Sequence, residues 1–306
     1  MSAALPSSAM LRAADRSEGV WLSAWRRFKS DRVGLVSLAI VIAFLLLIAL
    51  SALGLVAGNW QREVGVPYAN PTFLGPTPPP PAAQIEEGKG PPVDISTVDP
   101  LAPRYAEWAE RASKLKVDEE VRDNTLPLGG DRLGRDVLAK AIKGAEISIF
   151  VGVLAALLAT AIGTALGAVS GFLGGRVGDL LEWVYNVFTS IPGILLIFAF
   201  AAVFGRGTGT VVLILGLTGW TGIYRLVRAE FLKHAVRDYV RAAEAIGASH
   251  GARIFKHILP NVSHVALVQL SLHVVSFIKS EVILSYLGLG VSVDQVSWGT
   301  MLAEAQ

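Results

Sequence analysis

The sequence predicts an all-α polytopic membrane protein, and three observations support this prediction. Hydrophobic residues make up 52% of the 306 residues, and charged residues make up only 17%. Soluble domains carry about 25% charged residues, so most of this surface does not meet water, in agreement with a mean hydropathy of +0.51. Five runs approach or reach the roughly 20 apolar residues that cross a bilayer, and none shows the alternation of barrel strands. The runs are therefore expected to be helices, which satisfy their own backbone polar groups in lipid.

The predicted spans divide the chain in order. A cytoplasmic N-terminus over 1–32 leads to the first span at 33–57, which is longer than the roughly 7–15 residues of a signal-peptide core and is expected to stay as an anchor. The segment 58–146 follows as an external loop with a Pro-rich insert and a surface helix, because it has too few apolar residues for a core. The region 147–306 is expected to hold the other spans, at about 147–170, 180–204, 208–228 and 261–287.

Basic residues near the span ends predict the orientation. Cytoplasmic loops carry an excess of Lys and Arg, and such residues gather before the first span and between the fourth and fifth spans. The N-terminus and the segment 236–260 are therefore expected on the cytoplasmic side of the inner membrane. Trp25 and Phe28, with Arg26 and Lys29 beside them, predict an interfacial helix ahead of the first span.

The segment 236–260 is predicted to form two short helices joined by a glycine. Apolar residues recur at helical spacing on both sides of Gly247, which stands where a glycine ends a helix. Ser249 is expected to cap the second helix, and Pro260 is expected to end it. Periodicity alone is equally compatible with a loop that lies on the lipid headgroups, its basic residues meeting anionic lipid.

The same segment resembles the EAA loop of bacterial ABC-importer permeases, in the run Ala242-Ala243, then Gly247, then Ile258-Leu259-Pro260. In that family the loop is the coupling helix, which docks in a cleft of the ATPase subunit. This chain has Arg241 where the family often has Glu. The resemblance implies an ATPase-coupling interface made by Arg241, Ala242, Ala243, Glu244, Gly247, Ala248, Ser249, His257, Leu259 and Pro260.

A second motif narrows the resemblance. LGGDRLGRDV at 128–137, followed by KGA at 143–145, resembles the signature that precedes the second span in the C-type partner of the dipeptide/oligopeptide and nickel permeases, with Gly130 in place of the usual Thr. The glycines allow a tight turn, and Asp131 or Asp136 is expected to cap a short helix on the membrane surface. A direct grip on an external binding protein is the alternative role.

A third run, Ser297–Leu302 (SWGTML), resembles the SWGxML run that precedes the last span of the family. The resemblance implies a type I ABC-importer transmembrane domain, with five spans visible here of a usual six and with 288–306 on the external side. It is close over 128–306 and loose over 21–57.

Polar residues inside the spans are candidates for a cargo pathway or for bonds between helices. Pro192 breaks the hydrogen-bond ladder of the third span next to Ser190. Gln269 and His273 share one face of the fifth span at i, i+4 spacing, and polar groups at membrane depth usually face the protein interior or a wet path. Glu281, near the external end, is expected to meet the interface or a partner.

The sequence offers no cofactor site of its own. It has no cysteine, and no two histidines near the segment 236–260 fall on adjacent turns, so a metal site is not predicted. No GxxxxGK[ST] loop is present, so the chain is not expected to be an enzyme or to hold ATP. The formal charge of +2 is too small to suggest a nucleic-acid partner.

The resemblance implies a permease subunit of an ATP-driven importer for short peptides. Its expected partners are a homologous second permease subunit, two cytoplasmic ATPase subunits that carry ATP and Mg, an external solute-binding protein and the lipid bilayer. Two alternatives stay open. One is import of nickel or another small solute by the same architecture, and the other is a membrane anchor or scaffold that moves nothing.

Overall fold

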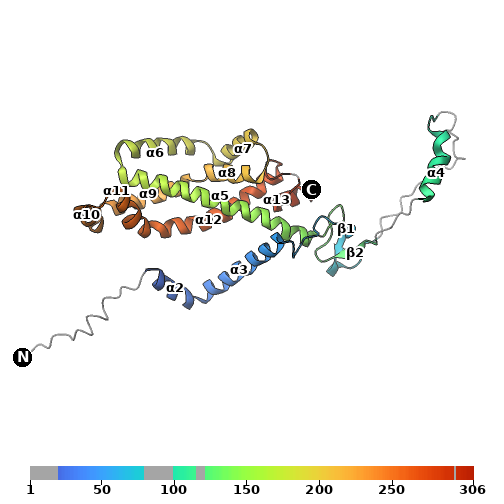
Figure 1. The fold of residues 1–306 in the computed structure, drawn as a ribbon, viewed down its shortest axis with the longest axis horizontal. Helices are drawn as coiled ribbons and strands as arrows, with labels where there is room; N and C mark the ends of the chain where they lie inside the picture. The colour runs from blue at the N-terminus through green and yellow to red at the C-terminus, as the bar shows by residue number, and fades with distance from the viewer. Residues whose placement is uncertain (1–19, 79–98, 115–120, 293) are drawn as a thin grey trace, which may run out of the picture. The chain divides into compact units, whose positions relative to one another are not determined.

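The structure is a computed structural model that describes residues 20–78, 99–114, 121–292 and 294–306 (Figure 1). The Pro-rich part of the external insert and residues 1–19 lie outside the described residues. The chain divides into two units, Met1–Val56 and Ala57–Gln306. The described residues are mostly helical, which confirms the predicted fold class.

The first unit consists of helix α2 (Val20–Ser30) and helix α3 (Arg32–Ala52). Asp31 caps α3 by accepting hydrogen bonds from the amides of the next turn. In α2, the rings of Trp25 and Phe28 stack with their centroids 5.7 Å apart, and the Lys29 ammonium lies 5.5 Å from the Trp25 ring. This aromatic and basic side agrees with the interfacial helix that the sequence predicts.

Helix α3 ends at Ala52 rather than at residue 57. Gly54 takes a positive φ of 73°, its amide donates to the Ser51 carbonyl at 2.9 Å, and the Leu55 amide donates to the Leu50 carbonyl at 3.0 Å. This pair of bonds is the usual closure of a helix at a glycine. The apolar run that follows is therefore not helical, although its composition suits a span.

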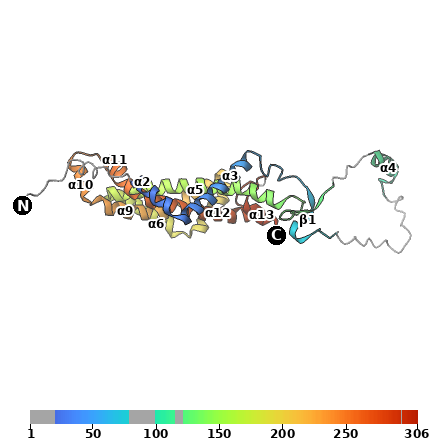
Figure 2. The same ribbon diagram turned by 90° about the horizontal axis from the view of Figure 1, so that it is seen from below.

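The second unit is built around a 37-residue helix, α5 (Val137–Leu173). Figures 1 and 2 show α5 running lengthwise beside α9 and α12, and α8 also packs on it. The other long helices are α6 (Gly175–Ser190), α7 (Gly193–Phe204), α8 (Thr208–Thr218), α9 (Thr221–Ala235) and α12 (Leu259–Tyr286).

Helix α5 corrects the predicted boundary at residue 147, because it begins ten residues earlier and has no break there. Asp136 caps it by accepting a hydrogen bond from the Leu138 amide at 2.8 Å. A helix of this length measures about 56 Å, whereas the hydrocarbon core is about 30 Å thick. Its first turns therefore extend beyond the membrane, and the expected surface helix and second span are one rod.

The third span is two helices, because α6 and α7 meet at 86° with Pro192 at the break. A single kinked helix is thus the wrong description. Ile191 is extended, at φ −96° and ψ 129°, as is usual for a residue before proline. Two hydroxyls bond carbonyls at the end of α6: Thr189 donates to the Tyr185 carbonyl at 3.0 Å and Ser190 to the Val187 carbonyl at 2.8 Å. Four described helices are candidate spans, or five if this bent pair counts as one.

Helices α5 and α9 touch through their backbones. A Cβ placed on Gly163, Gly167 or Gly171 would lie 2.6, 2.7 and 2.6 Å from the carbonyl oxygens of Trp220, Tyr224 and Arg228, respectively. These three glycines, called the glycine row below, contact α9 at four-residue steps. Small residues at such spacing allow close helix packing in membranes. The row was not singled out from the sequence.

Two apolar clusters form the core. One joins α5 to α7, α8 and α12 around Val151, Ala155 and Leu215. The other, called the inner cluster, joins α5 and α9 to the segment 236–260.

The segment 58–146, predicted to be a loop, also contains strands. Strand β1 (Gly65–Pro71) pairs in parallel with β2 (Asp123–Leu126), with Asn70 opposite Thr125. No pattern in the sequence predicts this pairing, because the two strands are far apart in the chain. Helix α4 (Tyr105–Lys114) agrees with the predicted surface helix, and α13 (Trp298–Glu304) closes the described chain.

The glycine row generates a first prediction. Gly167→Val is expected to lower the stability of the protein by about 1–3 kcal/mol, because a side chain there meets a backbone carbonyl and cannot be accommodated by rotation. The matched control is Gly222→Val on α9, where a Cβ meets nothing within 4 Å. Thermal unfolding in detergent measures both variants, and equal Tm values for the two would contradict the close contact.

Candidate functional site

The segment 236–260 lies at one end of the second unit, where α9 ends (Figures 1 and 2). It contains helix α10 (Asp238–Ala245), helix α11 (His250–Ala252) and a π-helical turn η3 (Arg253–Ile258). We call it the coupling segment, after the role that the resemblance implies.

Gly247 ends α10 as predicted. Its φ is 87°, its amide donates to the Glu244 carbonyl at 2.9 Å, and the Ala248 amide donates to the Ala243 carbonyl at 3.0 Å. Residues with a Cβ adopt this conformation at a cost. Ser249 then caps the next helix by accepting a hydrogen bond from the Ala252 amide at 3.3 Å. The two helices and their glycine joint are confirmed.

Pro260 does not end the second helix, which corrects the prediction. Helix α11 continues through η3 into α12, and Pro260 occupies the first turn of α12. Proline is tolerated at that position because its missing N–H is not needed there. The π-helical turn before it shifts the backbone hydrogen bonds locally without ending the helix. The coupling segment is therefore continuous with the fifth span rather than hinged to it.

The inward face of the coupling segment is anchored in the inner cluster. Val240 and Ala243 of α10 are 1% and 4% exposed, and Ile258 of η3 is fully buried. They belong to the same packed group as Val227 and Phe231 of α9. Burial of such side chains is worth about 1.5–3 kcal/mol each, so α10 is held firmly against α9 and the start of α12.

An arginine joins the two arms of the segment to α5. The Arg253 guanidinium lies 2.8 Å from the Glu244 carboxylate of α10, and it stacks 5.2 Å from the Phe172 ring of α5. The His250 ring meets the edge of the same Phe172 ring at 5.8 Å. The Arg253 side chain is 11% exposed and the Glu244 side chain is 60% exposed, so the ion pair lies at the surface and is screened by salt, whereas the stacking on Phe172 is not.

The outward face is apolar in part. Ile246 is 86% exposed and Phe255 is 68% exposed, although both belong to the apolar residues that recur at helical spacing in this segment. Of the predicted interface residues, Ala243 is turned inward and cannot present its side chain to a partner. Ala248, His257 and Leu259 are half-buried, and the exposed ones are Arg241, Ala242, Glu244, Gly247, Ser249 and Pro260.

A buried polar network lies beside the inner cluster and joins α5, α6 and α9. The Ser170 hydroxyl lies 2.9 Å from the Tyr224 hydroxyl and accepts a hydrogen bond from Arg228 Nε at 3.0 Å. The Tyr224 hydroxyl also donates to Glu182 of α6 at 3.2 Å. The broken third span is thus tied to the glycine-packed pair at this end.

The signature loop, residues 128–137, contains a glycine that leaves no room for a side chain. Gly134 has a φ of 77°, and a Cβ there would lie 1.9 Å from the Gly65 carbonyl oxygen of β1. Asp131 holds the turn by accepting hydrogen bonds from the amides of Leu133 at 2.9 Å and Arg135 at 3.0 Å. Asp136, and not Asp131, caps the helix that follows.

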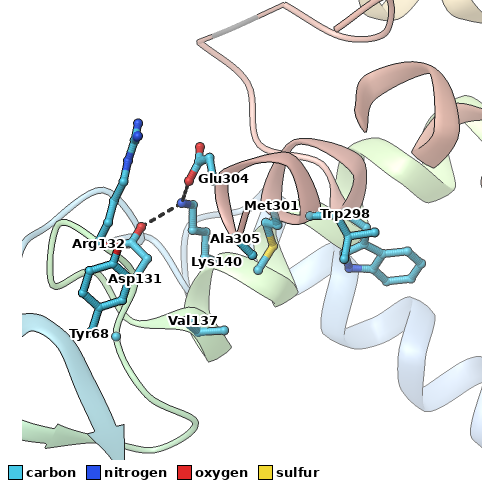
Figure 3. Close-up of a pocket in the computed structure, with 11 residues that line it drawn as sticks. Tyr68, Asp131, Arg132, Val137, Lys140, Trp298, Met301, Glu304 and Ala305 are labelled. Atoms are coloured by element: carbon cyan, nitrogen blue, oxygen red, sulfur yellow. Dashed lines mark hydrogen bonds and ion pairs between the residues drawn. The ribbon is translucent and has the colours of Figure 1, made fainter. Parts of the chain in front are cut away.

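The signature loop and α13 meet in one ionic cluster (Figure 3). Asp131 pairs with Lys140 at 2.8 Å and with Arg135 at 2.7 Å, and both cations also pair with Glu304 of α13. Burial raises the pKa of Asp131, but hydrogen bonds from Lys140 and from the Arg135 and Leu133 amides outweigh it and hold the pKa at about 2. Lys140 is only 2% exposed, and a buried ammonium group without such partners would destabilise the fold.

Residues of the SWGTML run hold α13 against α5 and α12. Ser297 caps α13, the Trp298 ring nitrogen donates to the Ala141 carbonyl at 3.0 Å, and a Cβ on Gly299 would lie 2.5 Å from Val282. A pocket of 540 Å³ lies between this helix and the signature loop, lined in part by Tyr68 and Met301 (Figure 3). Two motifs that are distant in the sequence thus form a single structure at one end of the second unit.

Comparison with known proteins identifies the chain. Residues 163–306 match the family model described as the inner membrane component of binding-protein-dependent transport systems. Residues 19–70 match the N-terminal TM domain of oligopeptide transport permease C. The oligopeptide permease protein OppC of Bacillus subtilis is 30% identical over 67% of each chain. The chain belongs to the dipeptide/oligopeptide family of ABC-importer permeases, as a C-type subunit.

Two further relatives agree. The dipeptide permease protein DppC of Bacillus subtilis is 39% identical over 60% of each chain. The DppC protein of Lactococcus lactis is 30% identical over 91% of this permease and 77% of its own length. The first family match includes the coupling segment, α12 and α13, and the second includes α2, α3 and most of β1. This permease is therefore a polytopic inner-membrane protein.

The polar residues inside the spans of this permease differ in their surroundings. His273 is half-buried, its ring lies 5.0 Å from that of Phe277, and its Nδ1 has no partner among the described residues. Gln269 is half-buried and Ser190 is exposed. Glu281 is fully buried and accepts a hydrogen bond from Ser285 at 2.6 Å, so the expectation that it meets the interface or a partner is wrong.

In the described ranges, no group of three or more His, Cys, Asp or Glu residues could hold a metal ion.

The ionic cluster generates a prediction with a defined pH dependence. Asp131→Asn is expected to lower stability by about 1–3 kcal/mol at neutral pH, because Lys140 and Arg135 lose a charged partner. The pKa of Asp131 lies below its ordinary 3.8, so ionised Asp131 stabilises the fold above about pH 4 and loses this effect as the pH falls toward 2. The Tm difference between wild type and variant should therefore shrink over that interval.

The control for this prediction is Asp136→Asn, which retains a good helix cap and is expected to change the Tm little. Thermal unfolding in detergent at several pH values between 2 and 7 provides the measurement. A Tm difference for Asp131→Asn that stays constant down to pH 2 would contradict the assignment.

Proposed function

We propose that this permease moves short peptides across the cytoplasmic membrane and is driven by two ATPase subunits that grip its coupling segment from the cytoplasmic side. The N-terminus is on the same side. The observation that carries the proposal is the continuity of the coupling segment with the fifth span. A helical segment whose second arm runs without interruption into α12 passes on a displacement, whereas a flexible loop would absorb it.

The mechanism follows from how the segment is held. A push on the exposed side of α10 acts on Gly247, whose closed turn resists bending, and on the Glu244–Arg253 ion pair. From Arg253 the displacement enters η3 and α12 directly, and the inner cluster carries it to α9. ATP and Mg bind to the ATPase subunits, and a homologous second permease subunit completes the cargo pathway.

The peptide cargo is supported by the names of the relatives, which are oligopeptide and dipeptide permeases. An external solute-binding protein delivers the cargo in this proposal. Import of nickel or another small solute by the same architecture is the alternative within transport. A membrane anchor or scaffold that recruits a soluble partner and moves nothing is the alternative from another class.

A reconstitution experiment separates these three functions. The permease is co-purified with candidate ATPase subunits and a candidate second permease subunit, inserted into vesicles and given a candidate binding protein. Uptake of labelled dipeptides and tripeptides supports the proposal, and uptake of nickel without peptide supports the first alternative. A complex that assembles but takes up neither cargo when ATP is supplied supports the scaffold.

The glycine joint generates the third prediction. Gly247→Val is expected to reduce peptide uptake and transport-coupled ATP hydrolysis by about tenfold, because a β-branched residue at a positive φ costs about 1–2 kcal/mol and opens the turn. Gly247→Asn is the matched control, since Asn tolerates this conformation, and it should retain most of the activity. Wild-type uptake by well-expressed Gly247→Val would refute the coupling role.

A further inference from the structure

A cavity of 290 Å³ lies where the broken third span meets α12. Its walls come from Ile194 and Phe198 of α7, from Thr218 at the end of α8, and from Ser276 and Ser280 of α12. Among the described residues that line it, none is charged. The lining therefore combines apolar surface with three hydroxyl groups.

The cavity adjoins a row of polar residues on α12, two of which line it. Gln269, His273, Ser276 and Ser280 are spaced by four, three and four residues, which places them on one face of the helix. We call them the polar stripe. The rest of α12 at this depth is largely apolar, and polar groups inside a membrane usually face a partner or a wet path. The unpartnered Nδ1 of His273 lies in this stripe, one turn before Phe277, which also lines the cavity.

Two glycines explain why the space exists. At Gly219 a Cβ would lie 2.3 Å from the Phe277 ring, so the ring already occupies the space beside that glycine. At Gly193, directly after the break at Pro192, a Cβ would meet nothing within 4 Å. The 86° bend carries α7 away from the line of α6, and no side chain at Gly193 fills the gap. The cavity therefore opens on the α7 side.

We propose that this cavity and the polar stripe form a cargo subsite, which takes one side chain of a passing peptide while the hydroxyls bond its backbone. The inference rests on the proposed peptide import. Pockets for whole ligands measure about 300–1,000 Å³, so this space suits part of a peptide. Because the lining is uncharged, the subsite selects by the size of the side chain rather than by its charge.

The first test uses the absence of cysteine from the sequence, which leaves no background thiol in this subunit, so labelling is read on this subunit alone. Ser276→Cys and Ser280→Cys are made one at a time, with Val275→Cys as the control on a neighbouring face of α12. Each assembled transporter is reconstituted in vesicles and treated with a charged, membrane-impermeant thiol reagent. Thiols at positions 276 and 280 are expected to react about tenfold faster than the control thiol, because charged reagents avoid lipid. A transported tripeptide is expected to slow that reaction.

The second test fills the cavity. Gly193→Leu places an apolar side chain in the open space, and Gly209→Leu is the matched control, at another helical glycine whose Cβ meets nothing within 4 Å and which does not line the cavity. Gly193→Leu is expected to reduce uptake of a phenylalanine-containing dipeptide about tenfold, as overfilling a packed site does, and to spare diglycine. Gly209→Leu is expected to transport both.

The outcomes separate the subsite from the transport function. If wild-type complexes import peptides while the thiols at 276 and 280 react no faster than the control, a lipid chain or a helix of the second permease subunit fills the space and the subsite is wrong. Equal uptake of both peptides by Gly193→Leu, or equal loss of both, also overturns it. Wild-type complexes that import no peptide refute the proposed function itself.

Discussion

The backbone contact between α5 and α9 is the constraint on which the rest of the structure depends. Each glycine of the glycine row meets a carbonyl of α9 one turn further along, at 2.6 to 2.7 Å from where a Cβ would lie. A slide or rotation of either helix would bring side chains into these contacts. Because lipid supplies no hydrophobic force between helices, such close packing is what holds membrane helices together. The contact therefore fixes both the distance and the register of the pair.

From this register the position of the coupling segment follows. Phe231 lies at the end of α9 beyond the glycine row, and it is the buried surface against which Val240 of α10 and Ile258 of η3 pack. The Arg253 contact with Phe172 adds an attachment to the end of α5. The segment is thus attached to the two helices that have the least freedom to move, while its outward face stays free. A segment that is packed firmly on its inward face and exposed on its outward face is suited to transmit force.

Local features could be predicted from the sequence, and long-range pairings could not. Gly247, Ser249 and Asp136 act on residues within two to four positions, so short patterns identify their roles. The ionic partners of Lys140 come from α13 as well as the signature loop, and no spacing in the sequence predicts such a pair. Pro192 indicated a break, but its 86° angle depends on how α7 packs against α8. Pro260 was misjudged because a proline in the first turn permits the helix to continue.

Both ends of the second unit are held by specific contacts, which leaves one element less restrained. The ionic cluster and Trp298 connect α5 and α12 to α13 at one end, and the glycine row connects α5 to α9 toward the other. Helix α7 has neither kind of contact and packs chiefly against α8. A displacement of α12 relative to α7 can therefore change the cavity between them without disturbing the glycine-packed pair. In the transport function proposed above, α7 of the broken third span is the wall that shifts within this rigid frame.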